Sequence, residues 1–256
     1  MENVSRKESW FEKTCLFRLT MNSKTFLQEN TLVPLAGQGS ATLGELNDTQ
    51  IFMCQEVGRG KRVVDLGCGD GRMLERLNEQ CNEAFGVEYN RRLVSQAQQR
   101  GLRVRNFDLN EGIPFEDEYF DCVVASDVVD SIFDSRFMFE EVHRILRRRG
   151  IFLFSVPNLN SLSNRIQMIR GSYLKRAGGF PEDTDGMRVR FFNTQKIYEL
   201  CRFSGFHVHQ IWGLPSAESS DAQGNRDVLR SIARPLYRWR PEVADILVVR
   251  ARRIDV

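Results

Sequence analysis

Residues 63–71 read VVDLGCGDG, and this stretch decides how the rest of the chain is interpreted. Two β-branched residues predict a buried strand, and three glycines at alternate positions predict a tight turn after it. A helical pattern follows, because apolar residues recur at helical spacing; they are Met73, Leu74 and Leu77. A strand, a glycine turn and a helix start, in this order, are how α/β folds hold a nucleotide-like ligand.

The spacing of the glycines narrows the class of ligand. A dinucleotide-binding turn commonly reads G-x-G-x-x-G and places a pyrophosphate at the helix N-terminus. Here the turn reads G-x-G-x-G, and Asp65 precedes it. A carboxylate beside the turn suits an ammonium group and would repel a pyrophosphate. The spacing therefore disfavours an NAD-dependent enzyme, and residues 65–71 resemble the first motif of the class I S-adenosylmethionine (SAM) methyltransferases.

Acidic residues follow the next predicted strands. Glu88 ends a strand at 84–88, where a carboxylate can accept both ribose hydroxyl protons of an adenosine cofactor. Asp108 and Leu109 follow a strand predicted at 102–107. In the methyltransferases an acid at this position meets the adenine amino group, and the backbone of its neighbour meets a ring nitrogen. The resemblance thus implies a cofactor site made of Asp65, Gly67, Cys68, Gly69, Gly71, Glu88, Tyr89, Asp108, Leu109 and Ser126.

The resemblance extends from about residue 62 to residue 212 and returns at the last predicted strand. It points in particular to the small methyltransferases related to methionine-biosynthesis protein W, and to those of glycan and natural-product pathways. The segments that carry it are 140–146 (EEVHRIL), 155–158 (SVPN), 161–165 (SLSNR) and 190–192 (RFF). It implies an α/β fold with a Rossmann-like, seven-stranded, mostly parallel sheet, helices on both faces and an antiparallel last strand.

Two positions at which many relatives carry histidine hold other residues here. A Glu-His pair after the fourth strand is replaced by Asp130-Ser131, and Arg188 stands where a histidine precedes the Phe-Phe pair. The resemblance therefore supplies no histidine base. His207 and His209 fall within a predicted strand, where packing or surface roles are expected.

Transfer of a methyl group to an oxygen requires removal of a proton, so a base is sought near the methyl position. Asp127 follows a buried strand predicted at 120–125, whose tip lies beside the transferable methyl group in the family. We take Asp127 and Asp130 as the candidate catalytic residues. The alternative for Asp127 is a supporting contact to the cofactor.

The chain divides into a leading segment and one domain. Residues 1–50 contain several aromatic side chains, and two interpretations stay open: a cap near the cofactor mouth, or an N-terminal helix that covers the sheet. Residues 51–256 are long enough for a complete methyltransferase domain. Residues 157–190 interrupt the alternation of strand and helix with glycines, arginines and apolar residues. Because ligands bind at the carboxyl ends of the strands, we expect this insertion to be a substrate lid.

The second half of the domain is predicted from periodicity. An amphipathic helix at 136–149, ended by Gly150, leads into a buried fifth strand at 151–156. A helix at 193–204 begins at a capping residue, Asn193 or Thr194. The final antiparallel pair is predicted at 206–212 and 246–250.

The composition of the chain limits the classes of partner that we expect it to bind. Lys and Arg number 36 against 34 Asp and Glu, which disfavours a nucleic-acid binder. The chain has no apolar run near the ~20 residues of a membrane helix, and residues 1–8 have no signal-peptide character. The six cysteines lack metal-ligand spacing, so we expect reduced thiols, no metal site and a cytoplasmic location.

These observations predict a SAM-dependent methyltransferase that releases S-adenosyl-L-homocysteine. The acceptor is expected to be an oxygen or nitrogen of a small molecule, a glycan or a natural product. Arginines recur every four residues from Arg226 to Arg238, which is typical of a solvated face or of a site for an anionic or carrier-bound acceptor or a membrane headgroup. The alternative function is a non-catalytic partner that keeps the SAM fold and binds another biosynthetic enzyme.

Overall fold

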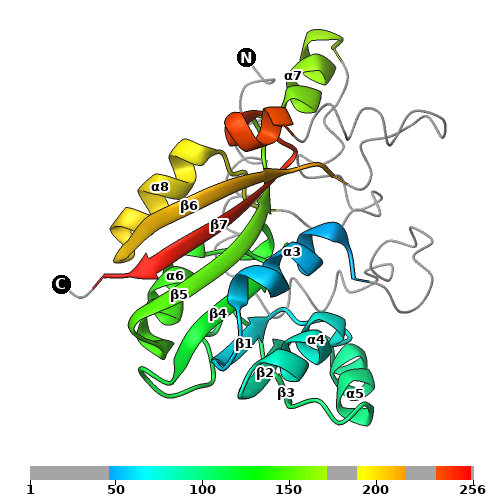
Figure 1. The fold of residues 1–256 in the computed structure, drawn as a ribbon, viewed down its shortest axis with the longest axis vertical. Helices are drawn as coiled ribbons and strands as arrows, with labels where there is room; N and C mark the ends of the chain where they lie inside the picture. The colour runs from blue at the N-terminus through cyan, green and yellow to red at the C-terminus, as the bar shows by residue number, and fades with distance from the viewer. Residues whose placement is uncertain (1–45, 172–188, 217–234, 255–256) are drawn as a thin grey trace, which may run out of the picture.

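The computed structural model of the chain describes residues 46–171, 189–216 and 235–254 (Figure 1). These residues build one seven-stranded sheet in the order β3-β2-β1-β4-β5-β7-β6. β7 runs antiparallel to both of its neighbours, and the remaining pairs are parallel. The expected fold class is therefore confirmed. The strands are β1 Arg62–Leu66, β2 Glu83–Glu88, β3 Val104–Asn106, β4 Phe120–Ser126, β5 Leu146–Pro157, β6 Phe206–Leu214 and β7 Ile246–Arg253.

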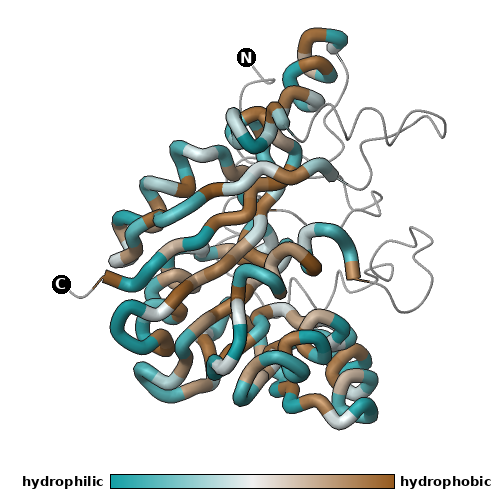
Figure 2. The backbone as a smooth tube through the Cα atoms, in the orientation of Figure 1, coloured by the Kyte–Doolittle hydropathy of each residue, from teal (hydrophilic) through white to brown (hydrophobic). Residues whose placement is uncertain are grey.

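Helices cover both faces of the sheet, as Figure 1 shows. Successive residues of a strand point to opposite faces, so Val63 packs with α3, α4 and α5 while Val64 packs with α6 and α8. Figure 2 shows hydrophobic residues along the central strands. The helices are α3 Asp48–Val57, α4 Arg72–Gln80, α5 Arg91–Gln99, α6 Ser135–Ile145, α7 Leu162–Ile169 and α8 Thr194–Phe203, with 3-10 turns η1 Val129–Ser131 and η2 Pro241–Val243.

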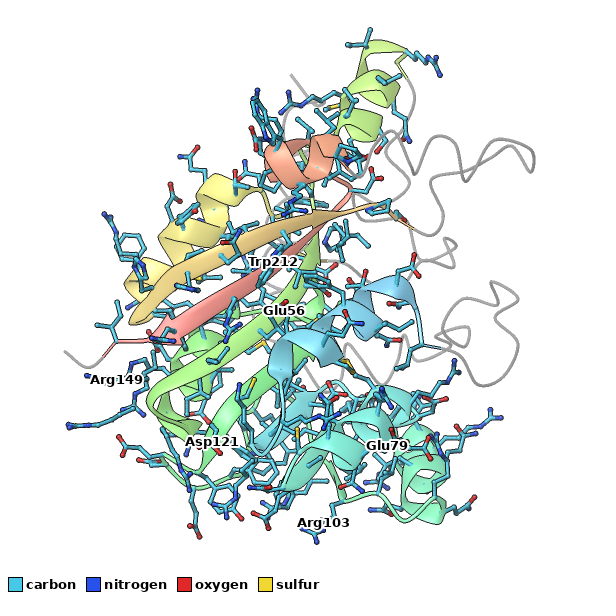
Figure 3. All side chains as sticks on the ribbon, viewed as in Figure 1. Glu56, Glu79, Arg103, Asp121, Arg149 and Trp212 are labelled. Atoms are coloured by element: carbon cyan, nitrogen blue, oxygen red, sulfur yellow. The ribbon has the colours of Figure 1, made fainter. Side chains whose placement is uncertain are left out.

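The helix predicted at 136–149 is too long, and Gly150 does not end it. α6 stops at Ile145, and the next residue already belongs to β5. Leu146 is fully buried opposite Phe120 of β4, so the chain enters the sheet immediately. The three arginines that follow form an irregularity in the strand, where Arg147 donates to Asp121 of β4 at 2.8 Å and Arg149 has a φ of 61°. Figure 3 labels Asp121 and Arg149 at the end of the molecule away from α7.

The other predicted elements agree more closely. The third strand is shorter than 102–107, because Leu102 N donates to Ala97 O and still belongs to the end of α5. α8 begins where predicted, and Asn193 is its cap, accepting a bond from Lys196 N at 2.8 Å. β6 and β7 form the predicted antiparallel pair.

The predicted cap and lid fall partly outside the described residues. Of 1–50, only 46–50 are described, and the expected boundary at residue 50 falls inside α3. Of 157–190, the structure describes α7 and its flanks, while 172–188 lie outside the described residues. Within the described ranges, no helix has the length and apolar character needed to cross a membrane.

Candidate active site

The glycine turn joins β1 to α4 at the carboxyl ends of the parallel strands. Gly67 N and Cys68 N both donate to Val87 O, at 2.8 and 3.1 Å, and so attach the turn to β2. Gly67 has a φ of 71°, and a Cβ there would lie 2.2 Å from Val128 Cγ2. Gly71 has a φ of 85°, and its Cβ would lie 2.5 Å from Leu102 Cδ1. The outer two glycines are therefore required by packing.

Gly69, the middle glycine, has a different environment. Its φ is 57°, and a Cβ built on it would meet no atom within 4 Å. Space therefore lies open over the bare backbone at the centre of the turn. This is the arrangement expected where a ligand approaches the main chain closely.

Glu88, at the tip of β2, braces the turn. Its Oε2 accepts a hydrogen bond from Gly69 N at 3.0 Å, and its Oε1 accepts one from Asn90 N at 2.7 Å. A carboxylate has about four acceptor positions, so both oxygens can take a further bond from a ligand hydroxyl. Sequence reasoning placed Glu88 at this tip, but the link to Gly69 is visible only in three dimensions.

Asp65 lies beneath the turn and is 2% exposed. Burial, and then the charge of Glu88, raises the pKa of its carboxyl to about 8. A cationic group placed nearby would stabilise the ionised form and offset this cost. Asp65 is therefore suited to a ligand that carries an ammonium group.

Asp108 follows β3 and has one carboxyl oxygen without a protein partner. Its Oδ1 accepts two hydrogen bonds from Asn110, from the backbone N and from Nδ2, both at 2.9 Å. Within the described part of the chain, its buried Oδ2 has no hydrogen-bond partner. An unpaired buried oxygen is costly, so its presence at a strand tip points to a donor on a ligand. The side chain of Leu109 is buried in the apolar core beside it.

Two asparagines that sequence reasoning missed position this edge. Asn106 Nδ2 donates to the carbonyl oxygens of Glu88 and Tyr89, at 2.9 and 2.6 Å. Asn110 Oδ1 accepts from Phe133 N at 3.0 Å and so connects the Asp108 loop to the start of α6. The spacing Asp-x-Asn at 108–110 is a local signal for a turn, but the contact with Phe133 is long-range and has no sequence signature.

Cys68 and Gly86 are packed as a pair. Cys68 is 8% exposed, and a Cβ on Gly86 would lie 2.6 Å from its Sγ. Burial, together with the nearby carboxylates, raises the pKa of the Cys68 thiol, so the sulfur stays protonated. Gly86 thus makes room for the turn, a role that the sequence pattern did not single out.

Asp127 follows Ser126 at the tip of β4 and has a left-handed backbone, with a φ of 54°. Its backbone N donates to Ser155 Oγ at 3.0 Å, and that hydroxyl is 3.4 Å from Asp127 Oδ1. Ser155 is fully buried on β5, and its hydroxyl is within reach of the exposed Asp127 carboxylate. Aspartate adopts the left-handed conformation more readily than most residues other than glycine, and such positions are frequently found at functional sites.

The second candidate acid, Asp130, has a more interior position than Asp127. It lies in η1 and is 2% exposed. Its carbonyl oxygen accepts from Val189 N and Arg190 N, at 2.9 and 3.0 Å. Asp130 thus connects η1 to the chain that returns from the insertion.

The histidines lie away from the strand tips. His207 pairs with Arg252 near the start of β6, at the opposite edge of the sheet, and His209 is exposed in mid-strand. His143 Nε2 lies 3.2 Å from Ile254 O, and its ring packs edge-on against Phe206. The exposed positions of His207 and His209 are those of surface residues, and His143 contributes to packing.

A groove of about 810 Å³ lies between α3 and the neighbouring face of β6 and β7. Its walls include Phe52 and Trp212, whose ring centroids are 5.2 Å apart, and Arg250, which pairs with Glu56 at 3.2 Å (Figure 3). The predicted site residues do not line this groove. Among the described residues, no cluster of three or more His, Cys, Asp or Glu could hold a metal ion.

Comparisons with known proteins show which proteins this chain is similar to. A probable S-adenosylmethionine-dependent methyltransferase of Mycolicibacterium smegmatis is 27% identical over 157 residues, which are 60% of this chain and 55% of that protein. The bifunctional methionine biosynthesis protein MetXA/MetW of Rhodopirellula baltica is 27% identical over 160 residues, 58% of this chain and 25% of that protein. The match thus spans about half or less of these two relatives.

The fold also matches solved structures. A SAM-dependent methyltransferase of Thermotoga maritima, described as a possible histamine N-methyltransferase, superposes with a TM-score of 0.58. It shares 19% identity, and the match covers 80% of this chain and 87% of that one, which shows a common fold. The family model described as methionine biosynthesis protein MetW matches residues 47–217, well over half of the chain. The chain therefore belongs to the MetW family, whose relatives include SAM-dependent methyltransferases.

Proposed function

We propose that this chain binds SAM and transfers its methyl group to an oxygen or nitrogen of a small-molecule, glycan or natural-product acceptor. The observation that carries the proposal is the open space over Gly69, whose backbone N donates to Glu88, with two further carboxyl groups at or near the ends of the two neighbouring strands, β1 and β3. These carboxylates belong to Asp65, Glu88 and Asp108. A zwitterionic adenosine ligand fits this set better than a pyrophosphate, because its ammonium group would stabilise the ionised form of Asp65 and a pyrophosphate would be repelled by Glu88.

The fit can be assigned group by group. Asp65 and the backbone of Gly69 would receive the amino-acid end, and Glu88 the ribose hydroxyls. Asp108 Oδ2, which lacks a partner among the described residues, would accept from the adenine amino group. The remaining predicted contacts are Gly67, Cys68, Gly71, Tyr89, Leu109 and Ser126. When bound, SAM supplies a methyl group already activated by a positive sulfur.

The protein's own contribution is position and a proton acceptor. Holding an acceptor beside the methyl group can supply up to ~7–11 kcal/mol of the barrier reduction. Asp127, whose carboxylate is within reach of the Ser155 hydroxyl, lies at the tip of β4 and is the best-placed group to receive a proton from an acceptor hydroxyl or amine. Such a base contributes ~10²–10⁴-fold to the rate.

The test is a matched pair of glycine variants. Gly69 and Gly101 both have a positive φ, and both have open space where a Cβ would be. Gly69→Ala and Gly101→Ala should therefore cost similar stability, about 1 kcal/mol each. We expect only Gly69→Ala to weaken SAM binding in calorimetry, by about tenfold or more, because its methyl group enters the ligand space. Equal SAM affinity in the two variants would contradict the proposal.

A second candidate is a non-catalytic partner protein. The relative from Rhodopirellula baltica, in which MetXA and MetW are parts of one bifunctional protein, favours this alternative. Incubation of the chain with methyl-labelled SAM and extracted metabolites distinguishes the two. Label in a new product supports methyl transfer, whereas tight SAM binding without turnover, together with a complex with a MetXA-type protein, supports the partner role.

A further inference from the structure

α7 turns its polar side toward the rest of the protein. Ser163 Oγ donates to Asp245 Oδ1, just before β7. Asn164 Nδ2 donates to the carbonyl oxygens of Asn158 and Leu159, at 3.0 and 3.1 Å. These bonds fix which side of the helix faces the domain. None of the residues of α7 is buried, so the opposite side is exposed.

That exposed side is apolar. Leu162, Ile166 and Ile169 are spaced i, i+4 and i+7, so they form one stripe. Their exposed fractions are 43%, 40% and 86%. A surface helix normally buries its apolar stripe and exposes its polar one. α7 has the reverse arrangement, so its apolar stripe is left without a partner among residues 46–171, 189–216 and 235–254.

A second segment adds to the same surface. Residues 235–239 are helical, and the hydroxyl of Tyr237 shares a hydrogen bond with Asp245, the residue that also holds Ser163. Tyr237 is thereby turned inward, while Trp239 is 87% exposed and Leu236 is 42% exposed. Figure 1 shows this segment and α7 next to each other at one end of the molecule, and Figure 2 shows hydrophobic residues along α7 there.

The same two segments are positively charged. Arg165 and Arg170 belong to α7 and its cap, and Arg238 and Arg240 to the second segment. Among the described residues, Glu242 pairs with Arg240 and is also influenced by Arg165, and the buried Asp245 lies between the two segments. Four arginines against these two carboxyl groups leave a net positive charge beside the exposed aliphatic side chains and the tryptophan. This composition is typical of surfaces that lie in the headgroup region of an anionic bilayer.

We propose that Leu162, Ile166, Ile169, Leu236 and Trp239 form a lipid-docking surface for an anionic membrane interface. α7 follows β5, and the second segment precedes β7, so the surface lies at the edge of the sheet where the strand tips carry the candidate active site. Docking would turn that edge toward the bilayer. Lipid binding itself is independent of the proposed methyl transfer, and the two can fail separately.

The test is co-sedimentation with vesicles at low salt. Vesicles of phosphatidylcholine with phosphatidylglycerol should pellet the full chain, and phosphatidylcholine alone should pellet much less. Ile169→Asp should lower the partition coefficient at least about tenfold, as expected when one large aliphatic side chain no longer enters the bilayer. Raising the salt concentration should also weaken binding, because the arginines contribute through screened charge.

Phe203→Asp is the matched control. Phe203 is 65% exposed on α8, away from this surface, so its replacement should leave vesicle binding unchanged. Thermal denaturation of both variants checks that each is folded. Equal pelleting of Ile169→Asp and Phe203→Asp, or no binding to anionic vesicles, would overturn the proposal. A wild-type dimer that Ile169→Asp converts to a monomer, without vesicle binding, would instead assign the surface to a second copy of the chain.

Discussion

Single residues in the glycine turn have separate tasks. Gly67 and Gly71 are needed because neighbouring side chains occupy the space of a Cβ, whereas Gly69 leaves that space open. The two carboxyl groups near the turn, those of Glu88 and Asp65, also have different surroundings. Glu88 is held by two backbone donors, while burial leaves Asp65 with a raised pKa. Gly67, Gly71 and Glu88 therefore hold the turn in place. Gly69 leaves open space beside the backbone, and Asp65 is left buried with a raised pKa.

Asp65 should make the stability of the ligand-free protein pH-dependent. Its folded-state pKa of about 8, raised by burial and then by Glu88, lies above the unfolded value of about 3.9. The folded state therefore holds the proton more tightly, and this residue's contribution to stability falls as pH rises from about 4 to about 8. Urea unfolding across this range should show a flatter pH dependence for Asp65→Asn than for wild type.

Glu88 should matter for both the turn and the ligand. Glu88→Ala removes both backbone contacts, while Glu88→Gln keeps one acceptor oxygen, so alanine should destabilise the fold more. SAM affinity should fall by ~1.5–3 kcal/mol in Glu88→Ala, the usual cost of losing hydrogen bonds to a charged group. Calorimetry measures the affinity, and denaturant unfolding measures the stability. SAM affinity within twofold of wild type would mean that Glu88 only braces the turn.

Asp127 and Ser155 provide a test of the proposed base. If Asp127 accepts the proton, Asp127→Asn should lower kcat by at least ~10²-fold with little change in SAM affinity. Ser155→Ala removes the hydroxyl within reach of this carboxylate and should lower kcat less, without abolishing it. A cofactor-supporting role would show the opposite pattern, with weaker SAM binding and unchanged kcat at saturation. The kcat of each variant is measured with the acceptor that the labelling experiment identifies, and SAM affinity is measured by calorimetry without it.

At the scale of elements, what the sequence predicts depends on how local the cause is. β1, β2 and β4 are short apolar runs next to turn residues, and their ends could be predicted within one or two residues. The end of α6 could not, because Arg147, Arg148, Arg149 and Gly150 look like the end of a helix. Their real position depends on Phe120 and Asp121 of β4, which are more than twenty residues away in the chain.

For the candidate site, too, residues with a local cause could be predicted and residues with a long-range cause could not. The positions of Asp65, Glu88 and Asp108 could be predicted because each lies within two residues of the end of its own strand, and parallel strands bring their carboxyl ends to one edge. Gly86, Asn106 and Ser155 could not, because each acts through a neighbouring strand or the turn beside it. The apolar side of α7 was also missed, since its orientation depends on the bond from Ser163 to Asp245.

For the whole molecule, ligand binding should appear as added stability. A ligand that binds only the folded state at 100 times its Kd stabilises it by about 2.7 kcal/mol. For a chain of 256 residues this corresponds to a Tm increase of several degrees. SAM and S-adenosyl-L-homocysteine should both raise Tm, and NAD should not. A shift with NAD alone would support the dinucleotide alternative that the glycine spacing disfavours.

The place of β7 in the sheet has a consequence for how the chain is made. β6 pairs only with β7, and β7 lies between β5 and β6 although it comes last in the described chain. During synthesis, the edge of β5 and the whole of β6 must therefore wait unpaired until residues 246–253 have left the ribosome. Domains of this size fold largely as units as they emerge, and unpaired edges are sites of misassembly. A nascent chain stalled before β7 should therefore bind chaperones. Once β7 emerges, it can pair with β5 and β6 and complete the sheet.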